Sequence, residues 1–109
     1  RLAHAIRAGA QAIGFAVFSS SPSHAVTALT APAGIESSAV VKRLRDVHAM
    51  VVAGGQDRLK GKILRIGHMG AYQREDAGAV VGALEECVIA LGHAAGGGVA
   101  AALTAWERA

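Results

Sequence analysis

Cysteine is almost absent from this sequence: among its 109 residues there is one, Cys87. One cysteine cannot form a disulfide within the chain, so nothing indicates an oxidising compartment and a cytoplasmic location is expected. Cys87 falls on the apolar stripe of a helical pattern, which favours a buried, inert thiol over a nucleophile. Long apolar runs are absent as well, so we expect no membrane-spanning segment and no membrane partner.

Aromatic residues are scarce, at 4% of the chain, and the formal net charge is only +3. Basic residues gather at 42–45 and 58–62, but Tyr72 and Trp106 lie far from both clusters in the sequence. Because no aromatic side chains for base stacking stand among the basic ones, we expect solvated surfaces and no nucleic-acid partner. The histidines are scattered, with no pair at helical i, i+4 spacing, so no metal site is expected.

Hydrophobic periodicity divides the chain into helices and short strands. The expected elements, in chain order, are a helix capped by Gly14, strands at 15–18 and 25–30, a helix at 37–48, strands at 50–53 and 62–66, a helix at 74–91 and a helical stripe at 99–106. This order predicts an α+β two-layer sandwich, with a small mixed or antiparallel sheet and helices mainly on one face. Residues 19–23 are expected to form a turn, and Val47 to join the buried face of its helix.

An arginine stands inside the predicted strand at 62–66. Alternation places Arg65 on the face opposite Leu64 and Ile66. A guanidinium flanked by aliphatic residues is partly desolvated, which is tolerable only if an acidic partner or ligand meets its planar fork of donors. Two interpretations remain open from the residues alone: a clamp for a substrate carboxylate, or a structural ion pair with Glu75 or Asp76.

Glycines surround this strand on both sides. Gly54, Gly55 and Gln56 precede it in a loop that suggests a phosphate cradle, but the spacing fits neither a P-loop nor a dinucleotide fingerprint. A loop beside an active site or a dimer contact is the favoured interpretation. After the strand, the glycines of Gly67-His68-Met69-Gly70 favour a sharp turn into the next helix, and His68 is a candidate cleft residue.

The segment from Val52 to Gly70 resembles the C-terminal domain of class V pyridoxal-phosphate aminotransferases, most of all the alanine–glyoxylate and serine–pyruvate group. The features that carry the resemblance are a glycine pair, a polar loop, Gly-Lys, an aliphatic pair, Arg-Ile-Gly, a further glycine and an acidic helix start. The similarity runs from the strand at 15–18 to Gly92-His93. It implies that residues 1–109 are the C-terminal small domain of a homodimeric enzyme, in which Arg65 holds the substrate carboxylate.

The resembled family moves an amino group from an amino acid, such as alanine or serine, to a 2-oxo acid such as glyoxylate or pyruvate. Its cofactor needs a Schiff-base lysine, an acidic partner and phosphate donors. Lys42 lies on an exposed helix face, and Lys60 and Lys62 lack the family motif. The resemblance therefore implies that a large upstream domain holds pyridoxal 5'-phosphate, and that this chain alone is inactive.

Two alternatives to the enzyme remain. Gly67-His68-Met69-Gly70 is superficially similar to the Gly-x-x-Gly loop of KH nucleic-acid modules, but that loop joins two helices and here it follows a predicted strand. The other alternative is a freestanding regulatory domain that binds an amino acid. Against it, Arg1 opens directly into helical periodicity without an initiator Met, which we interpret as a sign of a fragment. The amino donor and acceptor cannot be told from these residues.

Overall fold

The computed structural model describes residues 2–20, 26–54, 62–67 and 74–108. Its elements, in chain order, are α1 (Leu2–Ala12), β1 (Ala16–Ser20), β2 (Val26–Thr30), α2 (Ser37–His48), β3 (Ala53–Gly54), β4 (Ile63–Gly67), α3 (Arg74–Ala90) and α4 (Gly98–Arg108). The strands form one sheet in the order β1-β2-β4-β3, and every neighbouring pair is antiparallel. The predicted two-layer α+β class is confirmed, and the sheet is antiparallel rather than mixed.

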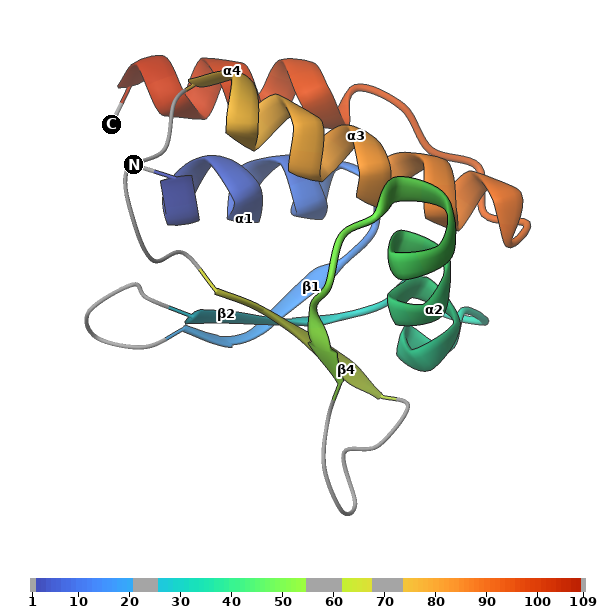
Figure 1. The fold of residues 1–109 in the computed structure, drawn as a ribbon. Helices are drawn as coiled ribbons and strands as arrows, with labels where there is room; N and C mark the ends of the chain where they lie inside the picture. The colour runs from blue at the N-terminus through green and yellow to red at the C-terminus, as the bar shows by residue number, and fades with distance from the viewer. Residues whose placement is uncertain (1, 21–25, 55–61, 68–73, 109) are drawn as a thin grey trace.

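The helices form a layer over one face of the sheet. In Figure 1, α1, α3 and α4 lie side by side above the strands, and α2 stands beside β4. Leu29 of β2 and Leu64 of β4 are register partners, and both are fully buried beneath this layer. No described helix covers the opposite face of the sheet (Figure 1). Apolar burial on one side thus leaves the other side of β4 available for a ligand or another part of a protein.

Glycine ends two of the helices, as the sequence predicts for Gly14. At the end of α3, Gly92 has a φ of +101°, a conformation that costs other residues about 1–2 kcal/mol. The N–H of His93 then donates to the carbonyl of Val88 at 2.8 Å, and that of Gly92 to Ile89 at 3.0 Å. This is a Schellman cap, which satisfies carbonyls that the helix leaves without partners. Gly14, with a φ of +103°, ends α1 in the same way.

The third strand is shorter than predicted and lies later in the chain. Residues 50–52 are outside the sheet, and β3 is only Ala53–Gly54. The reason lies at the end of α2, where the N–H of Met50 donates to the carbonyl of Leu44 at 2.9 Å and holds the chain against the helix. Val51 consequently points into solvent, with 86% of its surface exposed.

Two smaller predictions are also wrong. Ser19 and Ser20 belong to β1 rather than to a turn, because a bulge between Val17 and Ser19 lets the strand continue along β2. The remainder of the predicted turn lies outside the described residues. Val47 is 54% exposed, because the contacts of α2 with α3 and the sheet use its other apolar positions, among them Val40 and Leu44.

Candidate functional site at the open face of the sheet

Arg65 lies where the alternation of β4 places it, on the face turned away from the helices. Its register partners are Ala28 of β2 on one side and Ala53 of β3 on the other. Small neighbours on both sides leave space above the backbone for a long side chain. Ile63, which shares this face, is only 5% exposed, and Arg65 itself is half-buried. The guanidinium therefore stands in a partly dry setting, where a charged ligand is held more strongly than in water.

A backbone carbonyl holds one edge of this guanidinium. Arg65 Nε donates to the carbonyl oxygen of Gly54 at 3.2 Å, across the edge strand β3. Within the described part of the chain, no hydrogen bond is found for its two Nη groups. These groups carry two parallel N–H donors, which is the geometry that a carboxylate accepts in a bidentate pair.

Of the other predicted site residues, the structure describes Gly54 alone. Gly54 lies in β3 and presents its carbonyl to a cation, which is the opposite of the N–H groups that a phosphate cradle would offer. Gly55, Gln56 and His68 lie outside the described residues. Of the proposed ion-pair partners, Glu75 is exposed in the first turn of α3, beside Asp76. The role of Arg65 as a carboxylate clamp, rather than as a member of a structural ion pair, stays a prediction.

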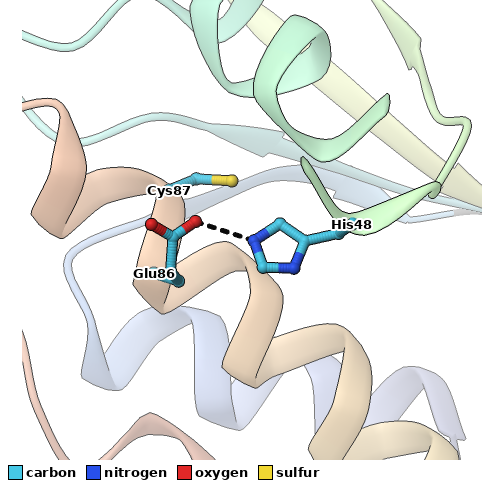
Figure 2. A group of neighbouring side chains, drawn as sticks. All are labelled: His48, Glu86 and Cys87. Atoms are coloured by element: carbon cyan, nitrogen blue, oxygen red, sulfur yellow. Dashed lines mark hydrogen bonds and ion pairs between the residues drawn. The ribbon is translucent and has the colours of Figure 1, made fainter. Parts of the chain in front are cut away.

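A second polar cluster, which the sequence analysis missed, joins α2 to α3. Glu86 accepts hydrogen bonds from Arg43 Nε at 3.0 Å and Nη2 at 2.6 Å, and its Oε1 lies 2.7 Å from His48 Nε2. Figure 2 shows His48 reaching across to this carboxylate. Arg43, and then His48, hold the pKa of Glu86 at about 2, well below its usual value. The partners lie about 40 residues apart in the chain, a separation that carries no sequence signal.

Cys87 completes a group that resembles a metal site. One ligand atom from each of His48, Glu86 and Cys87 lies within 4.8 Å of the others. However, Arg43 engages both oxygens of Glu86, and its positive charge opposes a bound cation. Burial, and then the charge of Glu86, raise the pKa of the Cys87 thiol to about 11, so it stays protonated and poorly ligating at neutral pH. For this group of residues, these observations favour an ion-pair cluster over a metal centre.

We expect this cluster to make stability depend on pH in the acid range. Because the pKa of Glu86 is lowered on folding from 4.5 to about 2, the stabilisation is complete above pH 4.5 and is lost as the pH falls through 2. Denaturant unfolding at pH 5 and pH 2.5 should therefore show a smaller loss of stability for Glu86→Gln than for the wild type. Glu36→Gln, which alters another surface carboxylate, should keep the wild-type dependence. An unchanged acid dependence in Glu86→Gln would contradict this assignment.

Two hollows among the described residues lie away from Arg65. One, of about 410 Å³, lies between α1 and α4 and is lined largely by alanines, with His4 at its edge. The other, of about 310 Å³, lies between α2 and the end of α3 near Val47 and Leu91. Neither includes the open sheet face.

Comparison with known proteins places this fold in a functional context. No family model matches the chain. An uncharacterised aminotransferase of Methanocaldococcus jannaschii is 42% identical over 94 residues, covering 84% of this chain and 24% of that protein. The small subunit of a soluble hydrogenase of a Synechococcus species is 40% identical over 107 residues, covering 94% of this chain and 28% of that protein.

The solved structures that superpose on this chain include two aminotransferases. Pyridoxamine–pyruvate aminotransferase of Mesorhizobium loti superposes with a TM-score of 0.84 at 34% identity, over 98% of this chain and 29% of that one. Ureidoglycine–glyoxylate aminotransferase of Bacillus subtilis superposes with a TM-score of 0.83 at 31% identity, over 97% of this chain and 29% of that one. The homologues of this chain are class V aminotransferases. The chain spans about a quarter of the length of these relatives.

Within the aminotransferase family, the chain matches the C-terminal domain of the fold-type-I enzymes. This fold disfavours the KH alternative, because Gly67 is the last residue of β4, whereas a KH loop joins two helices. No helix of the described residues is long and apolar enough to cross a membrane. The aminotransferase homologues imply that the full-length enzymes of this family depend on pyridoxal phosphate.

The described residues of this chain do not supply a site for that cofactor. Lys42 is 73% exposed on α2 and lies 3.6 Å from Asp46, and Lys62 is exposed before β4. Neither lysine stands in an enclosed setting with an acidic partner for the pyridine ring and donors for a phosphate group. Lys60 lies outside the described residues. A Schiff-base lysine is therefore not found in the described part of the chain.

Proposed function

We propose that this chain is the C-terminal small domain of a homodimeric, cytoplasmic aminotransferase, whose other parts hold pyridoxal phosphate. The proposal rests on the match of nearly the whole chain to about 29% of each aminotransferase structure. It also rests on the lack of a fitting cofactor lysine among the described residues. The cofactor supplies the electron-sink chemistry. This domain supplies a binding group for the substrate.

Arg65 is the residue that carries the proposal. Its guanidinium lies on the open face of the sheet, where Nε donates to the carbonyl of Gly54. Among the described residues, neither Nη group has a hydrogen-bond partner, so both are available to a ligand. A bidentate bond from these groups to a carboxylate fixes the position and the orientation of an amino acid or 2-oxo acid. Arg65 thus discriminates substrates that carry a carboxylate from simple amines.

The names of the relatives suggest the substrate class. Pyruvate and glyoxylate, which appear in the names of the two solved enzymes, are small 2-oxo acids with a carboxylate next to the carbonyl. We extend this class to the present protein: an alanine-like or serine-like donor, and glyoxylate or pyruvate as acceptor. One small domain with one fork of donors suits short substrates of this kind.

Borohydride reduction in the presence of pyridoxal phosphate tests the assignment. In a protein that contains this chain, we expect one stoichiometrically labelled lysine outside residues 1–109, together with amino transfer from alanine or serine to glyoxylate. Residues 1–109 alone should give neither result. Specific labelling of Lys42, Lys60 or Lys62 would overturn the assignment. Amino-acid binding without any amino transfer would favour the freestanding regulatory domain instead.

A further inference from the structure

We propose that the backbone carbonyl of Gly54 is a positioning group for Arg65, and that the edge strand β3 exists in this fold to present it. This inference rests on the proposed function, in which Arg65 binds the substrate carboxylate. The carbonyl oxygen accepts a hydrogen bond from Arg65 Nε at 3.2 Å. It does not touch the substrate, and acts by fixing the direction in which the fork points.

The choice of Nε as the bound nitrogen has a direct consequence. A guanidinium has five N–H donors in one plane, and a carboxylate can approach it either across Nε and one Nη or across both Nη groups. Because the bond to Gly54 occupies Nε, the side approach is closed. The end-on approach, across both Nη groups, remains. Gly54 therefore selects one of two orientations for the substrate.

The register of β3 places the carbonyl for this role. Ala53 is the partner of Arg65, and Gly54 is the partner of Leu64, so the Gly54 carbonyl stands one position along from the arginine. The side chain of Arg65 meets that carbonyl with Nε. β3 comprises only two residues, and these two are the ones that set this carbonyl against Arg65.

The glycine side chain is not what the site requires at this position. Among the described residues, a Cβ built on Gly54 meets nothing within 4 Å, and the φ of Gly54 lies outside the left-handed region. The described residues therefore leave space for a side chain at this position. The functional group is the carbonyl oxygen, which any residue at this position would keep. This explains why a sequence pattern at position 54 cannot reveal the role.

An ester in place of the peptide bond that follows Gly54 tests the inference, because an ester carbonyl is a weaker acceptor. The ester is introduced by nonsense suppression with glycolic acid at position 55, in the protein that contains this chain. We expect the KM for alanine to rise about five-fold with kcat nearly unchanged, since one hydrogen bond to a charged group is weakened. The kinetics of the corresponding amine without a carboxylate should not change.

One control separates this role from a structural one. An ester that follows Val51, outside β3, should leave the KM for alanine unchanged. If the ester after Gly54 leaves the KM for alanine unchanged, or affects the amine equally, the positioning role fails. The clamp itself fails separately, when Arg65→Ala does not distinguish alanine from the amine.

Discussion

Replacing Arg65 with alanine is expected to lower kcat/KM for amino-acid substrates by more than an order of magnitude in the protein that contains this chain. The fork of Arg65 binds a carboxylate through charge-assisted bonds in a half-buried setting. Removal of the fork leaves the carboxylate without its partner, which costs about 2–5 kcal/mol. Steady-state kinetics with alanine and with the corresponding amine measure the effect, and the amine should respond little.

Two further substitutions test whether the paired donors of Arg65, rather than positive charge alone, bind the carboxylate. Arg65→Lys should recover only part of the activity, because an ammonium group supplies the charge without two parallel donors. Lys62→Ala removes an exposed positive charge just before the same strand and should leave kcat/KM unchanged. The cofactor absorbance and the fold should be intact in all three variants. If Arg65→Ala unfolds the protein, or slows the amine as much as the amino acid, Arg65 is a structural ion-pair residue.

The order and type of the elements follow from the sequence because burial acts locally through periodicity. Alternation in β4 is enough to place Leu64 in the core and Arg65 opposite it, and the positive φ of Gly92 is enough to end α3. β3 is the exception. Val51 and Val52 have high β propensity, but the hydrogen bond from Met50 to Leu44 keeps the chain at the end of α2. A contact with the preceding helix outweighs propensity there.

The site is predictable only as far as it depends on side chains that alternate along one strand. Arg65 can be found this way, but its partner is the carbonyl of Gly54, and every residue has a carbonyl. The cluster around Glu86 is hidden for a different reason. Arg43 and His48 lie on one helix and Glu86 on another, so their meeting depends on how α2 packs against α3. Contacts that depend on tertiary packing leave no residue spacing in the sequence from which they could be predicted.

Gly9 illustrates the same limit, and it gives the largest expected effect on stability. A Cβ at Gly9 would lie 2.7 Å from Val81 Cγ2 and 2.9 Å from Ala102 Cβ, which belong to α3 and α4. Val81 and Ala102 are fully buried, and Ala102 Cβ is fixed to the backbone of its helix. The helices must therefore separate to admit one methyl group. We expect Gly9→Ala to destabilise the fold by about 1–3 kcal/mol, as overpacking outweighs the gain in helix propensity.

Gly82→Ala is the matched control, because Gly82 also lies inside a helix of the same layer. A Cβ at Gly82 would lie 3.5 Å from Val99 Cγ2, an ordinary van der Waals distance. Only the propensity term remains there, so this variant should be more stable than the wild type by about 0.5–1 kcal/mol. Denaturant unfolding of both variants measures the two signs. If Gly9→Ala is as stable as Gly82→Ala, the contact of α1 with α3 and α4 is looser than these distances require. Opposite signs would show that it is close packing, rather than the flexibility of glycine, that requires Gly9 in α1.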